Sequence, residues 1–304
     1  MTTVSVILTT YNSESSIQRL LDSIFSQQGL GINFKIELIV IDDCSCDSTR
    51  EILKGNKVEY LSTTSNSGGP NKGRNIGLKI ASGDYICIAD HDDEWHSDRL
   101  ITQLEYAGKA PIITSGYTLI NNDSGKQTSR YNSVTGEGDF ILFDQNVIFL
   151  HFLSKSKKVQ LPYIGSILFS ADLKDILFEE HFGMVDFDWI LRLSHKRRSV
   201  DVCRTLYNRY ISENNLSLYQ KYRTFDFFYS LLTIEQYEDQ YPKEVKIAYK
   251  RIHGSRARYF YLIDKMPKAR AHFKKAELSF KVILYYLTSY CGSGFVKKYF
   301  NIFG

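Results

Sequence analysis

Short apolar runs alternate with segments of helical hydrophobic spacing along the first third of the chain. The runs predict buried strands, and the segments between them predict helices that cover the strands. The predicted strands are residues 4–9, 36–41, 58–61 and 85–89, and the predicted helices are 17–25, 45–54 and a third that runs through Ile76 and Ile80 to a stop at Ser82-Gly83. This alternation is typical of an α/β fold with a mostly parallel sheet and helices on both faces.

Three carboxylates, Asp90, Asp92 and Asp93, follow the fourth predicted strand directly. Carboxylates this close repel one another unless a cation lies among them. Mg²⁺ or Mn²⁺ suits the position, because both take oxygen ligands and leave room for phosphate. The carboxyl ends of parallel strands also form the edge where open α/β sheets bind ligands. The pattern predicts a metal and diphosphate site, and the alternative is a polar turn before a helix that starts near Ser97-Asp98.

Five segments in a fixed order extend this interpretation. They are ILTTYN at 7–12, VIDDCSCDST at 40–49, NSGGPNKGRNIG at 66–77, GDYICIADHDD at 83–93 and DFDWILRL at 186–193. Together they resemble the family 2 glycosyltransferases of the GT-A fold, a large bacterial group that builds O-antigen, capsule and related surface polysaccharides. The resemblance covers residues 1–215. It implies a Rossmann-like GT-A sheet flanked by helices over these residues. The remaining residues, 216–304, are expected to form a helical C-terminal region.

The resemblance implies that the first two segments hold the nucleotide base. Thr9, Thr10 and Tyr11 would surround the base. Asp43, with Asp42 as the second choice, would accept a hydrogen bond from a base N–H, which favours uridine. The alternative for both aspartates is capping of the following helix, for which Ser45 and Asp47 are the other candidates.

The glycine-rich third segment is expected to approach the phosphates. Gly68 and Gly69 permit close backbone contact, and Lys72 and Arg74 offer positive charge at a helix start. Only one of the two cations need face the site. The alternative is that both lie on a solvated helix face.

In the resembling family the fourth segment binds the metal. Asp90 is expected to meet ribose or metal, and Asp92 to coordinate the Mn²⁺ or Mg²⁺ that neutralises charge on the departing diphosphate. Asp93 has two other possible roles, orienting Arg99 or capping the next helix. His91 is expected to pack beside the ligands rather than to bind the metal itself.

Asp186 is the expected general base, because its segment resembles the family's Glu-Asp-x-Asp helix start, whose aspartate takes the proton of the acceptor hydroxyl. Val185 replaces the first acid of that pattern. Asp188 suits capping or an acceptor contact, and the alternative is that both aspartates only cap the helix. Many relatives also carry a histidine after the last strand, whereas residues 207–217 contain none, which leaves Arg209 or Tyr210 as its replacement.

The composition is that of a soluble enzyme with one large domain and a smaller appendage. The chain has 304 residues, 43% of them hydrophobic. It contains no apolar run near the roughly 20 residues that a spanning helix needs. It enters its first strand without room for a signal peptide, so we expect a cytoplasmic protein. The five cysteines suggest reduced thiols and no zinc, because only Cys44-x-Cys46 is closely spaced.

The charge is concentrated at the C-terminal end. From Lys243 onward there are 14 Lys and Arg against 3 acidic residues, a net charge of +11, whereas the preceding residues, with 24 against 31, carry −7. The basic segment is also rich in Tyr and Phe, and its apolar residues at Phe280, Ile283, Leu284 and Leu287 follow helical spacing. Basic helices with aromatic flanks favour peripheral contact with an anionic membrane. The alternative is a helical cap with a solvated basic face, and no recognition motif supports nucleic-acid binding.

These observations predict a metal-dependent, inverting glycosyltransferase that uses a nucleotide-sugar, with UDP as the expected nucleotide. The expected acceptor is a lipid-linked saccharide at the inner face of the cell membrane. A sugar-nucleotide-forming nucleotidyltransferase is the rival enzyme, although residues 9–12 do not form the glycine- and lysine-bearing loop typical of that class. A non-catalytic saccharide- or membrane-binding module is the other alternative, and Asp90, Asp92 and Asp186 argue against it.

Overall fold

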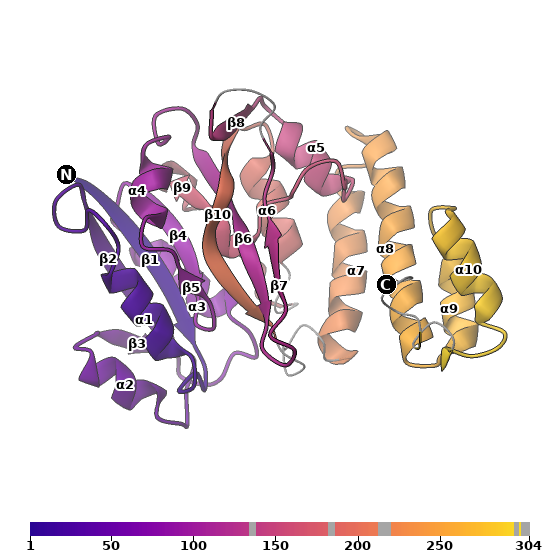
Figure 1. Ribbon diagram of the computed structural model, residues 1–304, viewed down its shortest axis with the longest axis horizontal. Helices are drawn as coiled ribbons and strands as arrows, with labels where there is room; N and C mark the ends of the chain where they lie inside the picture. The colour runs from indigo at the N-terminus through magenta and orange to yellow at the C-terminus, as the bar shows by residue number, and fades with distance from the viewer. Residues whose placement is uncertain (134–137, 182–185, 212–219, 295–297, 299–304) are drawn as a thin grey trace. The chain divides into compact units, whose positions relative to one another are not determined.

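The computed structural model describes residues 1–133, 138–181, 186–211, 220–294 and 298. The chain divides into two compact units, one formed by residues 1–149 and 157–223 and the other by residues 150–156 and 224–304. Figure 1 shows the sheet in the first unit and helices in the second. The predicted boundary between residues 215 and 216 lies within 212–219, outside the described residues.

Within the described residues, ten strands form one sheet in the first unit. The strands are β1 (Thr2–Thr10), β2 (Phe34–Asp42), β3 (Tyr60–Ser62), β4 (Tyr85–Asp90), β5 (Glu94–Trp95), β6 (Ile112–Asn121), β7 (Gln127–Arg130), β8 (Phe140–Phe143), β9 (Leu168–Ser170) and β10 (Ser199–Ile211). Their order is β3-β2-β1-β4-β9-β6-β10-β5, with β7 beside β6 and β8 beside β10.

The half of the sheet that contains the four predicted strands is entirely parallel. β1 pairs in parallel with both β2 and β4, and β2 pairs in parallel with β3. The register sets Thr10 opposite Asp42 and Thr9 opposite Asp90. The polar residues that follow these strands therefore meet at one edge of the sheet, as the strand–helix alternation predicts.

Beyond β4 the sheet is mixed. β9 runs antiparallel to both β4 and β6, whereas β10 runs parallel to β6. β5, β7 and β8 add antiparallel pairings at the margins. The hydrophobic pattern predicted no strands between residues 108 and 165, so β6, β7 and β8 are findings of the structure.

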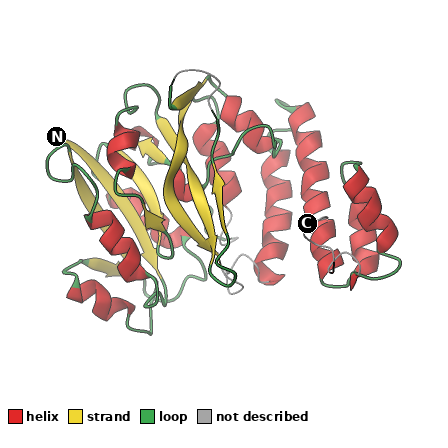
Figure 2. Ribbon diagram, in the orientation of Figure 1, coloured by secondary structure: helices red, strands yellow, loops and turns green. Residues whose placement is uncertain are grey.

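Helices cover both faces of the parallel half (Figure 2). Those of the first unit are α1 (Ile17–Phe25), α2 (Thr49–Gly55), α3 (Asn71–Ile80), α4 (Arg99–Leu104) and α6 (Asp186–Ser194), with short 3₁₀ turns at η1 (Ile164–Ser166) and η2 (Ala171–Leu173). Val6 and Leu8 of β1 pack in one core with Leu20 of α1. Ile7, which points to the opposite face, lies against α3 instead.

Two glycines let α3 approach β1 closely. A Cβ atom at Gly77 would lie 2.4 Å from Ile7 Cγ2, and one at Gly73 would lie 2.8 Å from Thr9 Cγ2. Any larger residue at these positions would push the helix away from the strand. This close contact fixes the start of α3 beside the end of β1, where the nucleotide site is predicted.

The helix predicted at 45–54 begins later, at Thr49. Cys44 adopts a positive φ of 64°, and the Ser45 backbone N–H donates to the Asp42 carboxylate (3.1 Å). Asp47 accepts hydrogen bonds from the backbone N–H and hydroxyl of Thr49 (3.0 and 2.6 Å). The preceding residues therefore form a polar turn, and Ser45 is not the cap.

The second unit consists of helices. The helices in or entering it are α5 (Val147–Leu153), α7 (Gln220–Glu235), α8 (Pro242–Leu262), α9 (Met266–Phe273) and α10 (Phe280–Thr288). Phe260, Tyr261, Phe273 and Tyr285 form the centre of a small core between α8, α9 and α10. Across the described residues, no helix combines the length and apolar character required to cross a bilayer.

Candidate active site

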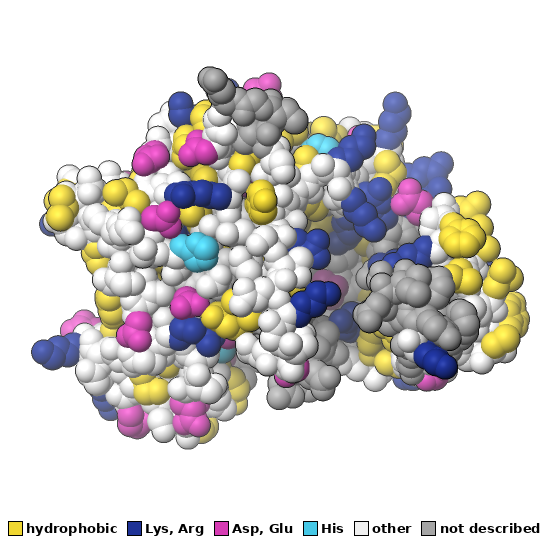
Figure 3. All heavy atoms as spheres, in the orientation of Figure 1, with side chains coloured by type: hydrophobic (Ala, Val, Ile, Leu, Met, Phe, Trp, Pro, Cys, Tyr) yellow, Lys and Arg dark blue, Asp and Glu magenta, His cyan; other side chains and the backbone are white. Residues whose placement is uncertain are grey.

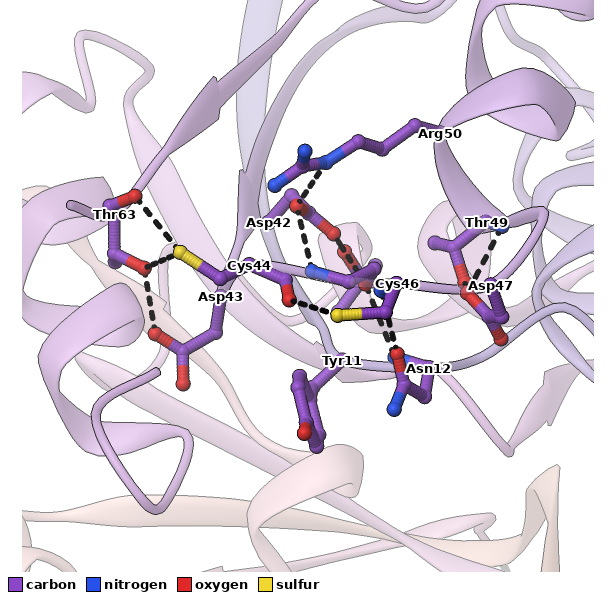
Figure 4. A network of polar contacts seen from close by, with 12 residues as sticks. Tyr11, Asn12, Asp42, Asp43, Cys44, Cys46, Asp47, Thr49, Arg50 and Thr63 are labelled. Carbon is purple, nitrogen blue, oxygen red and sulfur yellow. Dashed lines mark hydrogen bonds and ion pairs between the residues drawn. The ribbon is translucent and has the colours of Figure 1, made fainter. Parts of the chain in front are cut away.

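Asp42, at the end of β2, is enclosed by protein donors. Its Oδ1 accepts from the hydroxyls of Thr10 (3.1 Å) and Ser45 (2.5 Å), and its Oδ2 accepts from the Ser45 backbone N–H (3.1 Å) and Arg50 Nε (2.7 Å) (Figure 4). These four bonds use the acceptor capacity of a carboxylate. Burial raises the pKa of Asp42, but the hydrogen bonds from Ser45 and Arg50 outweigh it and lower the pKa. Asp42 therefore connects the ends of β1 and β2 to the turn at Ser45 and to Arg50.

Asp43, the next residue, accepts three hydrogen bonds, one fewer than Asp42. Its Oδ1 accepts from Thr63 Oγ1 (2.7 Å), and its Oδ2 accepts from both the backbone N–H and the hydroxyl of Ser67 (2.9 Å each), so the remaining acceptor capacity is on Oδ1. In Figure 4 its carboxylate and the Tyr11 ring lie on the same side of the loop. Tyr11 is 44% exposed, whereas Thr9 and Thr10, at the end of β1, are buried. The geometry thus presents one aromatic ring and one anchored carboxylate at the predicted base site.

Arg74 and Lys72, the two cations of α3, lie in different environments. Lys72 is half-buried on the first turn, whereas only 4% of the Arg74 side chain is exposed. Arg74 Nη2 donates to Asp90 Oδ1 (2.8 Å) and Nη1 donates to Asp186 Oδ1 (2.9 Å). The guanidinium therefore links β4 to Asp186, the predicted general base. Arg74 does not lie on a solvated helix face, the alternative that the sequence left open.

Asp90 accepts from two directions at the end of β4. Besides the Arg74 contact, its Oδ2 accepts from the Tyr163 hydroxyl (3.3 Å). Burial raises the pKa of Asp90, but the Arg74 guanidinium outweighs burial and lowers it, so this carboxyl is ionised. Tyr163 has the opposite response, since burial and the Asp90 charge raise the pKa of its hydroxyl well above the usual value.

The Asp92 carboxylate has no side-chain partner among the described residues. The loop that carries it is nevertheless fixed, because Arg19 Nη2 donates to the Asp92 carbonyl (2.7 Å) and stacks on the Tyr210 ring (3.8 Å to its centre). Burial raises the pKa of Asp92, and the nearby Asp90 charge adds to the effect. His91 points aside and contacts the Ser16 hydroxyl through Nδ1 (3.2 Å), consistent with a packing role.

Asp93 is 2% exposed, and its Oδ2 has no hydrogen-bond partner within the described part of the chain. Burial raises the pKa of Asp93 well above the usual value, and the charges of Asp90 and Asp92 raise it further. Neither role suggested by the sequence is seen. Arg99 bonds Gln103 (3.2 Å) and stacks on Trp95 (3.9 Å), and Asp98 occupies the N-cap position of α4.

Asp186 and Asp188 differ in the same way as Asp42 and Asp43, since one carboxylate of each pair is enclosed and the other is more open. Asp186 begins α6, is 29% exposed at its side chain, and touches Arg74. Burial raises its pKa, Arg74 opposes this, and the net pKa is raised. Asp188 is buried and bound by Arg192 one turn later, through Nε (2.9 Å) and Nη2 (2.6 Å). Val185, where the family pattern departs, lies outside the described residues.

Arg209 lies among the site carboxylates, and its charge lowers the pKa of Asp90, Asp92 and Asp186. Its guanidinium stacks on the Tyr163 ring at 3.9 Å. Tyr210, the other candidate for the missing histidine, donates its hydroxyl to Glu94 (2.7 Å) instead.

Tyr163 is a site residue that no sequence pattern indicated. It lies in the stretch without a predicted strand or helix, and no spacing signal connects it to Asp90, 73 residues earlier.

A sequence model of glycosyl transferase family 2 matches residues 5–170. The chain is 31% identical over 177 residues to a poly(ribitol-phosphate) beta-glucosyltransferase of Bacillus spizizenii, covering 56% of this chain and 27% of the relative. It is 28% identical over 169 residues to a GalNAc(5)-diNAcBac-PP-undecaprenol beta-1,3-glucosyltransferase of Campylobacter jejuni, covering 51% and 53%. The matches thus span about a quarter to a half of these relatives.

The fold also matches a solved structure. The first 349 residues of Staphylococcus aureus TarS, crystallised with UDP-GlcNAc, superpose with a TM-score of 0.65 over 98% of this chain and 92% of that one, at 18% identity. At this identity the likeness is evidence of the fold alone. Because the family model covers more than half of the sequence, the chain belongs to glycosyl transferase family 2, which confirms the predicted family, the α/β GT-A fold class and the glycosyltransferase class of enzyme.

Proposed function

We propose that this protein transfers a glycosyl group, with inversion, from a nucleotide-sugar to a saccharide acceptor. The observation that carries the proposal is the Arg74 bridge, which holds Asp90 and Asp186 on two nitrogens of one guanidinium. Asp90 is the last residue of β4, a strand of the predicted donor site, and Asp186 begins α6, which is distant from β4 in sequence. A transferase needs this arrangement, because the leaving group and the acceptor base must flank one reacting carbon.

The donor is a UDP-sugar in this proposal. Thr9, Thr10 and Tyr11 surround the base, and Asp43 accepts the uracil N–H. Because the Asp42 carboxylate is already filled by protein donors, its role is to hold the base loop in place. Support comes from the shared fold of TarS, which was crystallised with UDP-GlcNAc.

The phosphates lie in this proposal beside Lys72 and Arg209. Lys72 stands on the first turn of α3, and Arg209 is stacked on Tyr163 next to the carboxylates. Arg74 forms ion pairs with Asp90 and Asp186, so in this proposal it does not bind the phosphates directly.

The carboxylate cluster fits a divalent cation. Asp92 has no side-chain partner in the described residues, and burial together with the Asp90 charge raises its pKa despite His91 and Arg209, so a bound cation would favour its charged form. No three His, Cys, Asp or Glu side chains converge within the described residues, so Asp90 and Asp92 would hold Mn²⁺ or Mg²⁺ with diphosphate and water completing the shell. When bound, the cation would neutralise charge on the departing diphosphate.

Asp186 acts as the general base in the proposed reaction. It accepts the acceptor hydroxyl proton as that oxygen forms a bond to the anomeric carbon, while the bond from this carbon to the diphosphate oxygen breaks. The single displacement inverts the anomeric configuration and leaves a nucleoside diphosphate. Asp186 suits the role because it is partly exposed and its carboxylate oxygens are not all committed, whereas Asp188 is bound by Arg192.

The acceptor in this proposal is a saccharide of a bacterial surface polysaccharide, carried on a lipid. The Bacillus spizizenii and Campylobacter jejuni relatives are named for transfer to poly(ribitol-phosphate) and to an undecaprenol-linked saccharide, respectively. The lipid-linked class agrees with the basic and aromatic character of the second unit.

A donor screen tests the proposal. Purified protein with Mn²⁺ is incubated with UDP-, GDP- and TDP-sugars, and donor hydrolysis and thermal stabilisation are measured. We expect one UDP-sugar to give both signals and Asp92→Asn to lose the metal-dependent part of UDP binding in calorimetry, since an amide supplies no charge for the cation. Equal Mn²⁺-dependent affinity in the Asp92→Asn variant would rule out the metal role, and preference for a GDP- or TDP-sugar would replace the uridine assignment.

A further inference from the structure

The outer side of α10 carries apolar residues that the core of the second unit leaves exposed. We call these residues, with Leu278 just before the helix, the α10 stripe: Leu278, Phe280, Ile283, Leu287 and Tyr290. Phe280 and Leu278 are 82% and 81% exposed. Phe280, Ile283 and Leu287 recur at intervals of three and four, so they share one side of α10, and Tyr290 lies just beyond the end of the helix.

The orientation of α10 is fixed by its other side. Tyr285 is 1% exposed and packs against Tyr261 and Phe273, with ring centres 4.9 and 5.8 Å away. At the end of the helix, Arg270 Nη1 donates to the Ser289 carbonyl (2.9 Å). The helix therefore cannot rotate its apolar side inward without breaking this core. A helix that packs a mixed face and exposes an apolar one reverses the usual pattern of surface helices.

Basic residues border the α10 stripe. Lys274 and Lys275 are exposed at the end of α9, and Lys281 is exposed beside Phe280. The nearest acidic residue in sequence, Glu277, faces Arg251 in an ion pair (3.2 Å). Figure 3 shows hydrophobic side chains gathered over the part of the view that α10 occupies in Figure 1. The surface thus combines aliphatic and aromatic side chains with positive charge.

We propose that the α10 stripe docks the second unit on an anionic lipid bilayer, lying in the interface and not crossing it. Apolar side chains would enter the acyl boundary while lysines meet acidic headgroups, the combination that holds interfacial helices to membranes. Charge complementarity favours this occupant over a second copy of the chain, because a symmetric contact would bring the same lysines together. The inference goes beyond the proposed transfer reaction and does not depend on it.

Vesicle sedimentation of the full chain tests the docking. We expect binding to phosphatidylglycerol-containing vesicles that decreases as salt rises, and little binding to phosphatidylcholine alone, because headgroup attraction is screened within about 8 Å at physiological ionic strength. The Phe280→Ser, Ile283→Ser, Leu287→Ser triple variant should weaken binding at least about tenfold, since three apolar contacts are lost. A Lys274→Glu, Lys275→Glu, Lys281→Glu variant should lose the salt-sensitive part.

Matched controls change the same residue types on the first unit. Ile32→Ser with Leu61→Ser removes exposed apolar side chains, and Lys35→Glu with Lys54→Glu and Lys79→Glu reverses exposed charges. Both controls should bind vesicles like the unchanged protein. Absence of vesicle binding, equal binding to neutral lipid, or equal binding by the triple serine variant would each overturn the proposal. Gel filtration that shows a dimer dissolved by that variant would assign the surface to a second copy, and donor hydrolysis measured in parallel tests the transfer reaction separately.

Discussion

The strand ends of the first unit and the α10 stripe of the second are both exceptions to the usual partition of polar residues to the surface and apolar residues to the core. The first buries charged groups, and the second exposes apolar ones. At the strand ends, Arg74, Asp90 and Asp93 are charged or ionisable groups enclosed by protein. On α10, the large apolar side chains of Phe280 and Leu287 are exposed to solvent. Buried polar groups and exposed apolar patches are the informative exceptions to residue partitioning, so each region indicates a function.

The two regions differ in how their residues depend on one another. Arg74 neutralises Asp90 and Asp186 together, so removing one of the three alters the charge balance of the others. The α10 stripe rests on no such network, because the core behind it is formed by other residues, Tyr261, Phe273 and Tyr285. Substitutions at the strand ends should therefore change chemistry and stability, whereas those on α10 should change only docking.

The largest expected effect is at the proposed base. Asp186→Asn should leave donor and metal binding nearly intact and lower transfer about 10²–10⁴-fold, the range for loss of general-base catalysis. The loss should appear in kcat under saturating donor and acceptor. Asp188→Asn is the matched comparison, because its contact with Arg192 predicts reduced stability with a smaller effect on rate. If the Asp186→Asn variant transfers sugar at a rate within a few-fold of the unchanged enzyme, Asp186 is not the base and Asp188 becomes the candidate.

Asp42, at the end of β2, and the adjacent Asp43 provide the second comparison. Asp42→Ala should lower the free energy of unfolding by about 3 kcal/mol, because it leaves several buried donors unpaired. Asp43→Ala should instead weaken UDP binding about 10–100-fold, as expected for a hydrogen bond to a charged group. Urea denaturation and calorimetry measure the two effects. Stronger loss of UDP binding in the Asp42 variant would reverse the assignment.

The pH dependence of stability sharpens this comparison. The folded-state pKa of Asp42 is lowered, so its stabilising contribution is present above the unfolded pKa of about 4 and is lost as pH falls through the folded value. The stability difference between the unchanged protein and Asp42→Ala should therefore shrink below about pH 4. A constant difference across this range would show that the Asp42 charge is not stabilising.

A smaller effect is expected on the pH dependence of catalysis. The Arg74 charge lowers the pKa of Asp186 against burial, so Arg74→Gln should raise that pKa further. Because a base must be deprotonated, activity should then be lost at a higher pH as the solution is acidified. The acidic limb of kcat against pH, measured where circular dichroism shows intact folding, checks the shift. If the acidic limb does not shift in the Arg74→Gln variant, Arg74 does not control the pKa of the catalytic base.

The smallest effect is expected on α10. The Phe280→Ser, Ile283→Ser, Leu287→Ser variant should transfer sugar to a soluble acceptor within about twofold of the unchanged enzyme, because exposed side chains contribute little to stability. Initial rates with saturating donor measure this. A large loss with a soluble acceptor would show that the second unit takes part in the reaction.

Local patterns predicted the regions where each element buries a regular face. The runs at 4–9, 36–41 and 85–89 correspond to β1, β2 and β4, since a parallel strand covered on both faces is apolar throughout. The carboxylates after β4 were located for the same reason, because a strand end fixes where polar residues emerge. In the stretch between β5 and β9, mixed pairing replaced this regularity, and the local pattern predicted no strands.

The partners of the site residues were decided by tertiary structure. Arg74 and Asp186 are 112 residues apart, and Tyr163 and Asp90 are 73 apart, so no local spacing relates them. The family resemblance ranked Asp43 above Asp42 as the base ligand, but local sequence did not show that Asp42 is enclosed by Thr10, Ser45 and Arg50, because adjacent residues at a strand end meet their partners only once the loops have packed. The sequence showed the helical spacing of Phe280, Ile283 and Leu287. It did not show whether this face is buried or exposed, because that depends on which side of α10 packs against the Tyr261 and Phe273 rings.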